Sequence, residues 1–299
     1  MPVSVGVLRT SRPRSYLMCP PEYFRVDYAI NPWMDPARPT DAVLAYEQWT
    51  RLGDVLRGLG HAIELAQPHP DLPDMVFAAN AATVIDGRVL VASFRHGERA
   101  GESSVYERWF RTRGYRQVRM ARDFNEGEGD HLLAGGWILA GHGMRTGRAS
   151  HSETSGYFGR PVVGLTLVDP RFYHLDTALA VLSEREVMYY PAAFDAASLR
   201  RLRGLFPGAI EADAEDAAVF GLNAISDGRH VVLPAGATSL AARLAARGFT
   251  PVHVEVGELL KAGGGPKCCV LELRSRAPRF AAVPAGQGRA AASARPRGT

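Results

Sequence analysis

The sequence predicts an α/β fold built from one module repeated about five times. Short apolar segments alternate with longer amphipathic segments from end to end, which is typical of strands that alternate with helices. No linker rich in Gly, Ser or Pro divides the first part of the chain, so we expect a single domain over 1–276. The chain has 299 residues, of which 46% are hydrophobic and 22% charged, and this balance supports a large buried core.

Two local signals define elements in the first half of the chain. Asp41, or Thr40 before it, is a helix N-cap, and Gly60 ends the apolar periodicity that follows. Asp86-Gly87 stands between two β-rich runs, which is the strongest hairpin signal in the chain. The expected elements of this half are a strand at 16–19, a helix at 41–59, a strand at 61–65, a hairpin at 82–91 and a helix at about 98–113.

The second half repeats the order of hairpin, helix and strand in units of about 45 to 60 residues. Its expected strands lie at 136–140, 162–167, 178–182, 186–190, 219–224, 229–233, 251–256 and 269–273, and its expected helices at 150–158, 195–205 and 238–246. The last stretch, 277–299, is rich in Ala, Pro, Gly and Arg without periodicity, so we expect a disordered tail there.

Charge and composition argue against several classes of function. The net charge is +4, but 274–299 holds six arginines and no acidic residue, so the preceding part of the chain is slightly acidic. No basic stripe interleaved with aromatic residues appears before the tail, which argues against nucleic-acid binding. No apolar run reaches the ~18 residues of a membrane span, and the first residues lack the pattern of a signal peptide. We therefore expect a cytoplasmic protein with no nucleic-acid or membrane partner.

The three cysteines, Cys19, Cys268 and Cys269, are too few for a disulfide framework. Cys268 follows the run Gly263-Gly-Gly-Pro-Lys, where glycines allow close backbone approach and a thiol at a loop-to-strand junction can be exposed. Cys269 is then expected to face the core. The alternative is a Gly-rich turn that leads two buried cysteines into a strand.

Three further segments place polar residues where an α/β core would otherwise have turns. His174 and Asp176 lie two residues apart, so on an extended segment they share one face; the alternative is a surface strand or a helix cap. Asp74 and Asn80 likewise fall on one alternation around an expected strand, with an exposed strand edge as the alternative. The acidic loop Glu126-Gly-Glu-Gly-Asp130 suits a cation, but it lacks the Gly position and the terminal Glu of an EF-hand loop.

Together these residues favour a cysteine nucleophile over a metal centre. A thiolate needs a cation such as protonated histidine nearby, whereas zinc needs three or four ligands at closed spacing. The chain has no CxxC or HxxxH pair, and its carboxylates are then left to bind a cationic substrate. The alternative is a metal-dependent hydrolase that uses His131, His174 and the acidic loop.

These segments resemble the guanidino-group-modifying enzymes of the pentein superfamily: arginine deiminases, dimethylarginine dimethylaminohydrolases and amidinotransferases. The resemblance covers about 16–273 and rests on four motifs in the family's order. The segment ending in Cys268 looks like the nucleophile motif, His174-Leu-Asp176 like the histidine motif, 126–130 like the acidic motif with one residue added, and 74–80 like the first substrate-binding segment. The resemblance implies a five-bladed α/β propeller of ββαβ-type repeats around a pseudo-fivefold axis.

The resemblance also implies a covalent mechanism with no metal or organic cofactor. The thiolate would attack the guanidino carbon, and the histidine would protonate the departing amine and then activate water. Arg99 and Arg145 lie in the segments 94–99 and 141–146, which resemble the two places that supply arginines to the substrate carboxylate in the family. This resemblance predicts a small guanidino amino acid as substrate. The implied catalytic residues are Cys268, His174 and Glu126, and the implied substrate-binding residues are Asp74, Asn80, Arg99, Arg145, Asp176 and Asp130.

Two departures from the family motifs bear on the reaction. Asn80 stands where deiminases and dimethylarginine hydrolases commonly place an aspartate, which resembles the cyanobacterial arginine dihydrolases that take arginine to ornithine. The longer acidic motif leaves Glu128 as a second candidate for the role of Glu126. We expect a hydrolase acting on the guanidino group of L-arginine or an N-methylated arginine. The alternatives are a dimethylarginine dimethylaminohydrolase and, further, an amidinotransferase or a non-catalytic ligand-binding homologue. The apolar stretches 23–24 and 30–33 are candidates for a homo-oligomer interface or for the core.

Overall fold

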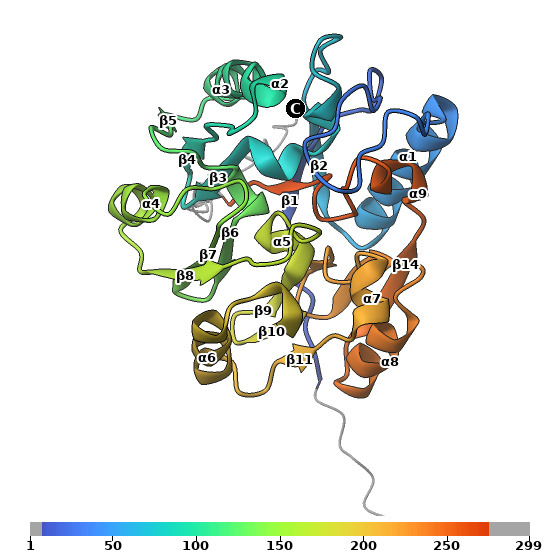
Figure 1. Cartoon of the computed structure of the whole chain (residues 1–299), viewed down its shortest axis with the longest axis vertical. Coiled ribbons are helices and arrows are strands. Elements are labelled where there is room, and N and C mark those ends of the chain that lie inside the picture. Colours follow the sequence, from blue (N-terminus) through green and yellow to red (C-terminus); the bar gives the residue numbers. More distant parts are fainter. Residues whose placement is uncertain (1–7, 275–299) are drawn as a thin grey trace, which may run out of the picture.

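Five three-stranded sheets surround a central axis in the computed structural model, which describes residues 8–274 (Figure 1). In four of them an antiparallel hairpin is followed by a helical segment and by a strand that pairs in parallel with the second hairpin strand. The fifth sheet is made from both ends of the described chain, because β15 pairs with β1. The predicted repetition of a hairpin, helix and strand module is therefore confirmed. The predicted tail at 277–299 lies outside the described residues.

Each sheet with its helix is called a blade here. The strands of the first blade are β15 (Leu271–Glu272), β1 (Ser15–Met18) and β2 (Ala62–Leu65). Those of the next four blades, in chain order, are β3 (Ala82–Ile85), β4 (Arg88–Val91) and β5 (Gln117–Met120); β6 (His131–Ala134), β7 (Trp137–His142) and β8 (Val162–Thr166); β9 (Leu179–Ser183), β10 (Glu186–Tyr189) and β11 (Ile210–Glu211); β12 (Ile225–Ser226), β13 (His230–Pro234) and β14 (Thr250–Val254).

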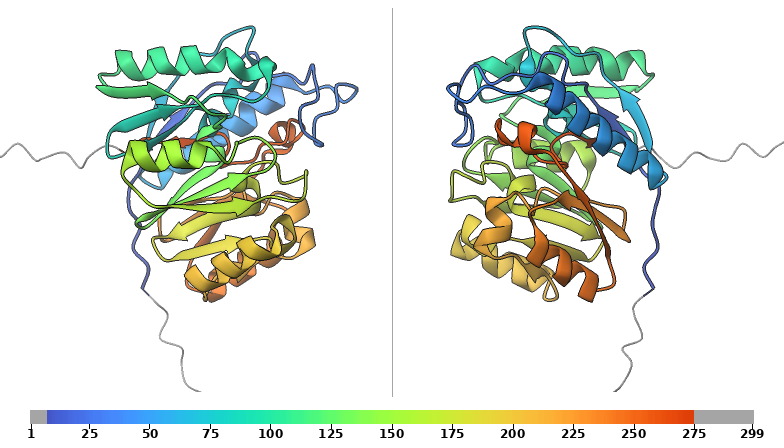
Figure 2. Two further views of the ribbon diagram at one scale, coloured as in Figure 1. Left: turned by 60° about the vertical axis from the view of Figure 1, so that its left-hand side comes forward. Right: turned by 90° about the vertical axis from the view of Figure 1, so that its right-hand side faces the viewer.

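The longer helices lie outside the ring of sheets, and the side views show α3, α6 and α8 along the outer edges (Figure 2). The α-helices are α1 (Ala42–Gly58), α2 (Gly97–Ala100), α3 (Glu102–Thr112), α4 (Ser150–Phe158), α5 (Leu175–Ala178), α6 (Ala196–Leu205), α7 (Ala214–Ala218), α8 (Thr238–Ala246) and α9 (Gly257–Leu260). Short 3₁₀ turns are η1 (Pro73–Val76), η2 (Ala78–Ala81), η3 (Gly127–Gly129) and η4 (Pro191–Ala193).

Local sequence signals explain where several elements begin and turn. The Asp41 carboxylate accepts the N–H of Leu44 at 3.0 Å, so it caps α1 as predicted. Asp195 caps α6 in the same way. Asp86 and Gly87 adopt φ angles of 53° and 75°, the left-handed values that a tight two-residue hairpin turn requires, and the predicted hairpin of β3 and β4 is confirmed.

The structure corrects several expected elements. The apolar run 219–224 is not a strand: Asp213 caps the short helix α7 before it, and Phe220 turns the chain with a φ of 59°. The expected helix at 98–113 is divided at Gly101 into α2 and α3. Strands β5, β6 and β11 were not expected, and the last strand begins at Leu271 rather than at Cys269.

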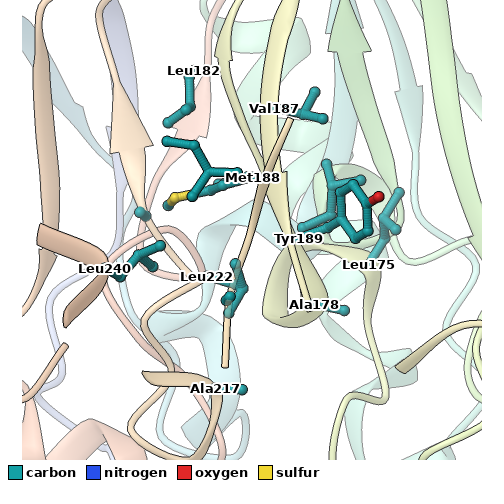
Figure 3. Packing of buried hydrophobic residues seen from close by; sticks show 14 of the residues in the cluster. Leu175, Ala178, Leu182, Val187, Met188, Tyr189, Ala217, Leu222 and Leu240 are labelled. Atoms are coloured by element: carbon teal, nitrogen blue, oxygen red, sulfur yellow. The ribbon is translucent and has the colours of Figure 1, made fainter. Parts of the chain in front are cut away.

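The largest core cluster joins neighbouring blades rather than filling one blade alone. On β10, Met188 points toward Leu222 and Leu240 of the next blade, whereas Tyr189 lies on the side of Leu175 (Figure 3). Alternating side chains of a strand point to opposite faces, so a central strand of each blade packs on both sides. The ring is held together by this shared apolar packing.

A cavity of about 1010 Å³ lies at one end of the axis, among the hairpin turns of several blades. Its lining includes Asp86 of the β3–β4 turn and Glu184 of the β9–β10 turn, together with Lys267 and Arg274. We call it the rear cavity. Within 8–274, no helix is both long and apolar enough to cross a lipid bilayer.

Candidate active site

The polar residues that precede the five inner strands meet at the end of the axis opposite the rear cavity. The inner strands are β3, β6, β9, β12 and β15, and in each case a turn or short helix comes before the strand. Four of these five segments are the ones predicted from the sequence, and the structure brings them together. The buried polar residues that they contribute, in chain order, are Asp74 and Asn80, Glu126 and Asp130, His174 and Asp176, Asn223, and Cys268.

Cys268 lies in the centre of this group and is only 1% exposed. Its Sγ is 3.3 Å from Oδ2 of Asp176 and 3.1 Å from Nδ2 of Asn223. Burial and the neighbouring Asp176 carboxylate raise the pKa of the Cys268 thiol well above its ordinary value. The sequence analysis expected this thiol to be exposed at a loop-to-strand junction. The structure instead encloses it before the strand begins. Cys269 is buried, as expected.

The glycines before Cys268 are required by close packing. A Cβ on Gly264 would lie 2.0 Å from the Phe77 ring, and one on Gly265 would lie 2.7 Å from Oδ1 of Asn223. Gly263 adopts a φ of 82° and sits against Asn31 and Tyr173. The backbone thus approaches its neighbours closely, as the glycine run predicts.

His174 and Glu126 form a buried pair, with 2.7 Å between Nε2 and Oε2. Arg145 donates to the same carboxylate oxygen at 3.0 Å and lies over the ring of Tyr173. Although burial opposes ionisation, Arg145 and His174 hold the pKa of Glu126 well below its ordinary value. With Glu126 ionised, Nε2 of His174 carries the proton, so the buried Nδ1, which has no partner among the described residues, is the atom left to exchange one.

His174 and Asp176 do not lie on an extended segment, because His174 is the N-cap of the short helix α5. Asp176 therefore turns toward Cys268, and burial raises its pKa to about 6. Asp130 accepts the backbone N–H of Leu175 at 2.9 Å and thereby holds the start of α5. Burial raises the pKa of Asp130 to about 6 as well, although His174 opposes this.

Asp74 and Asn80 do not flank a strand, as expected, but lie in the successive 3₁₀ turns η1 and η2. Oδ2 of Asp74 accepts the hydroxyl of Tyr28 at 2.9 Å, and burial raises the pKa of Asp74. Oδ1 of Asn80 accepts a hydrogen bond from Arg99 at 2.7 Å. Nδ2 of Asn80 lies on the side of Gly129 and His174, where a Cβ on Gly129 would meet it, and it has no partner among the described residues.

The two predicted carboxylate-binding arginines have different surroundings. Arg99 is buried and bonded to both oxygens of Glu102, at 2.7 and 2.9 Å, as well as to Asn80. Glu102, which the sequence analysis did not single out, has a pKa raised to about 7 by burial in spite of Arg99. Arg145 lies beside the exposed Arg95, whose Nε donates to the Arg145 carbonyl at 2.7 Å.

Of the two glutamates in the acidic loop, Glu126 is the one beside His174. Glu128 turns toward the rear cavity, where it accepts from Lys267 at 3.0 Å and pairs with Arg274. The added residue in this motif therefore does not displace Glu126 from the histidine. Among the described residues, no group of three or more His, Cys, Asp and Glu side chains is arranged to hold a metal.

The segment between β1 and α1 covers the site. Tyr28 contacts Asp74, the carbonyl of Ile30 accepts from Arg145 at 3.0 Å, and Asn31 donates to the Ala262 carbonyl. Trp33 donates to the carbonyl of Arg171. The stretch 30–33, a candidate for either an interface or the core, thus lies over the site within one chain; an oligomer interface there stays a prediction.

Several buried polar atoms around the thiol have no hydrogen-bond partner among the described residues. They are Oδ1 of Asp74, Nδ2 of Asn80, Oδ2 of Asp130, Nδ1 of His174 and Oδ1 of Asp176. Buried polar groups are ordinarily paired, so such a cluster points to a ligand that supplies hydrogen bonds. Three of these atoms are carboxylate oxygens, which suits a donor-rich cation such as a guanidinium group.

Comparison with known proteins yields close relatives, although no family model matches the chain. A protein named N(G),N(G)-dimethylarginine dimethylaminohydrolase from Mycobacterium tuberculosis is 52% identical over 89% of this chain and 87% of its own length. The bifunctional arginine dihydrolase/ornithine cyclodeaminase ArgZ from Synechocystis is 37% identical over 86% of this chain. This chain spans only 37% of the length of that larger protein.

Solved structures give the same result. The N-terminal domain of ArgZ, an arginine dihydrolase of cyanobacteria, solved with bound substrate, superposes with a TM-score of 0.85 at 36% identity, covering 88% of this chain and 98% of that domain. A dimethylarginine dimethylaminohydrolase superposes with a TM-score of 0.73 over 87% of this chain and 100% of that one, and at 20% identity it supports the fold alone. Five blades around one axis, the order of the motifs and these relatives agree: the chain belongs to the guanidino-group-modifying enzymes of the pentein superfamily.

Proposed function

We propose that this chain hydrolyses the guanidino group of L-arginine or of an N-methylated arginine through a covalent intermediate on Cys268. The observation that carries the proposal is the surrounding of the sulfur. A buried thiol lies 3.3 Å from Asp176, in a group of carboxylate oxygens without partners, next to a histidine held by Glu126. Thiol, proton carrier and cation-binding carboxylates are the parts that attack on a guanidinium carbon requires.

The reaction proceeds in two halves. The Cys268 thiol gives its proton to Nδ1 of His174, and the resulting thiolate bonds to the central guanidino carbon. The bond from that carbon to one terminal nitrogen breaks, and this nitrogen takes the proton from His174 and leaves as an amine. The carbon remains attached to sulfur as an amidino thioether. Water then adds to the carbon and gives a proton to His174, and the carbon–sulfur bond breaks to release the ureido product and restore the thiolate.

Glu126 and Asp176 hold the guanidinium nitrogens in this scheme. Ionised Glu126 also fixes the proton of His174 on Nε2, so that Nδ1 is the atom that gives and takes protons. Charge-assisted hydrogen bonds from a planar guanidinium to two carboxylates fix the orientation of the carbon toward the sulfur. Asp74 and Asp130, each with an oxygen free of partners, complete the polar lining.

The substrate carboxylate is proposed to bind Arg145, with the exposed Arg95 beside it. Arg145 donates from two of its nitrogens, to Glu126 and to the Ile30 carbonyl. Arg99, the other expected arginine, already donates from all three, to Glu102, Asn80 and the Asp74 carbonyl. We assign it instead to orienting Asn80, because its hydrogen bond to Oδ1 leaves Nδ2 of Asn80 directed into the site. This division retains the expected amino-acid substrate and places its carboxylate between the buried Arg145 and the exposed Arg95.

The neutral amide of Asn80 favours unmethylated arginine, and a second hydrolysis to ornithine, since a donor at this position suits a ureido oxygen better than a cation. A second candidate is hydrolysis of dimethylarginine to citrulline and dimethylamine. It is favoured by the 52% identity to a protein of that name.

The test is product analysis by mass spectrometry after incubation with L-arginine and, separately, with asymmetric dimethylarginine. Citrulline and ammonia indicate one hydrolysis of arginine, ornithine indicates two, and dimethylamine indicates the second candidate. Cys268→Ser should abolish every product, whereas Cys269→Ser, a matched change at the adjacent buried cysteine, should leave the product pattern unchanged. Equal turnover by Cys268→Ser and wild type, or inactivity of wild type on both substrates, contradicts the proposal.

A further inference from the structure

Asn223 is the polar residue that the fifth blade contributes to the site, and the sequence analysis did not single it out. It follows the turn at Phe220 and precedes β12, the position that the other four blades fill with the predicted site residues. Its side chain is fully buried. The position in the repeat indicates that Asn223 belongs to the site rather than to the general core.

Both atoms of the Asn223 amide are fixed by backbone groups. Oδ1 accepts the N–H of Cys268 at 3.1 Å, and Nδ2 donates to the carbonyl oxygen of Asp176 at 3.0 Å. A backbone N–H can only donate and a carbonyl can only accept, so these two partners determine which end of the amide is nitrogen. The atom that lies 3.1 Å from the Cys268 sulfur is therefore a hydrogen-bond donor.

We propose that Asn223 stabilises the thiolate of Cys268 by donating a hydrogen bond from Nδ2 to the sulfur, while its Oδ1 holds the Cys268 backbone. This inference rests on the proposed role of Cys268 as nucleophile and adds the group that supports its charged form. Gly265 makes the contact available, because any Cβ there would lie 2.7 Å from Oδ1.

The two polar neighbours of the sulfur have opposite effects on the ionisation of the Cys268 thiol. Oδ2 of Asp176 can only accept when ionised, so it favours the protonated thiol at 3.3 Å. Nδ2 of Asn223 can only donate, so it favours the thiolate. Once a cationic substrate pairs with Asp176, that carboxylate no longer opposes ionisation of the Cys268 thiol. Nδ2 of Asn223, on the other side of the sulfur, then stabilises the thiolate for attack.

The experiment measures ionisation of Cys268 without substrate. The rate of alkylation by iodoacetamide is followed from pH 6 to 10.5, with the modified cysteine mapped by mass spectrometry, and thiolate absorbance at 240 nm is recorded on the same samples. Cys268→Ser supplies the background from the other cysteines. The pH midpoint is compared rather than the rate, because access of the reagent also changes the rate.

Asn223→Ala should move the midpoint to higher pH by at least about one pH unit, so that the thiolate fraction at pH 8 falls about tenfold. Asn223→Asp keeps an acceptor for the Cys268 N–H but replaces the donor by a carboxylate oxygen, so its midpoint should move further in the same direction. Ser198→Ala is the matched control. It removes a buried side-chain contact in the fourth blade, to the N–H of Thr166 at 2.8 Å, and should leave the midpoint unchanged.

If Cys268 ionises at the same pH in Asn223→Asp as in wild type, the inference is overturned. A purely structural role of Asn223 needs only the acceptor for the Cys268 N–H, which aspartate keeps. The same holds if Asn223→Ala loses activity with an unchanged midpoint. Neither measurement requires turnover, so a chain that fails to hydrolyse arginine still tests the role of Asn223. Conversely, Cys268-dependent hydrolysis together with unshifted midpoints rejects this inference and leaves the proposed function intact.

Discussion

Glu126 and Glu128 are separated by one glycine yet serve opposite ends of the axis. Glu126 contacts His174 and Arg145 in the candidate active site, where neighbouring polar atoms lack partners. Glu128 points to the rear cavity and contacts Lys267 and Arg274, each of which has further partners there. Both carboxylates are fully buried. Identical side chains in one short loop therefore sit in two different clusters, one with several unpartnered carboxylate oxygens and one in which the carboxylate is paired with two cations.

This difference separates residues that hold the fold from residues that meet a ligand. Around Glu128, positive and negative groups alternate from Lys267 to Arg274, so the buried charges are compensated within the chain. Around the candidate active site, carboxylate oxygens of Asp74, Asp130 and Asp176 have no partner among the described residues. Single unpartnered atoms also occur elsewhere in the described residues, but carboxylate oxygens gather without partners only here among them, as expected of a site that binds a cation.

Among changes at the two glutamates, the larger expected effect on activity is that of Glu126→Gln. The amide keeps the shape but removes the charge that orients His174, so kcat should fall about a thousandfold. Steady-state release of ammonia from L-arginine measures this. Retention of more than about a tenth of wild-type kcat would contradict the assignment of Glu126.

Glu128→Gln is the matched change at the other end and should act on stability. It leaves Lys267 and Arg274 buried without their anionic partner, so the free energy of unfolding should fall by about 3–5 kcal/mol. Urea denaturation followed by circular dichroism measures the loss, and kcat of the folded fraction should stay within about tenfold of wild type. If activity fell as far as in Glu126→Gln, the separation of the two ends would be wrong.

Arg145→Lys tests the outer part of the active end. Lysine retains one charge but not the fork that bonds Glu126 and the Ile30 carbonyl together. The ratio of kcat/KM for arginine to that for agmatine, which lacks the carboxylate, should fall about tenfold. Arg99→Lys serves as the comparison and should leave that ratio nearly unchanged; a larger fall there would return Arg99 to the carboxylate site.

Asp130→Asn should give the smallest effect and raise stability. Burial raises the pKa of Asp130 from 3.8 to about 6, so the folded chain holds this proton more tightly than the unfolded chain. The corresponding stabilisation is present below pH 3.8 and is lost as the pH rises to about 6, above which a buried charge remains. At pH 7.5 the variant should be more stable by about 1–3 kcal/mol, and this gain should shrink toward pH 4. Thermal unfolding across that pH range checks the sign.

Local signals in the sequence predicted the elements whose ends depend on neighbouring residues. Asp41 caps α1 by a contact within one turn, and Asp86-Gly87 forms a hairpin because few other residues adopt its turn angles. The repetition of the module was predicted because each blade reproduces the same order of strands and helix. Four of the five site segments were predicted from motifs, because Cys, His and acidic residues in those patterns indicate the chemistry they perform.

The site residues that the sequence analysis did not predict are recognised only by contacts with residues distant in the chain. Asn223 looks like any asparagine in an apolar run until Cys268 is placed against it, and Glu102 is recognised only through its bond to Arg99. An extended segment was expected for His174, with a helix cap as one alternative, and spacing alone did not decide between them; His174 occupies the N-cap position of α5. The place of each polar residue before an inner strand is the signal that would have found Asn223.

The blade assembled from both chain ends has a consequence for biosynthesis. Strand β1 pairs with β15, and the pairing partners Leu17 and Leu271 can meet only after the strands of the other four blades have been synthesised. Closing the ring therefore carries the entropy cost of a very long loop, which slows the final step relative to local hairpins. Because Cys268 lies just before β15, the proposed nucleophile is synthesised only when the strand that closes the ring is about to follow.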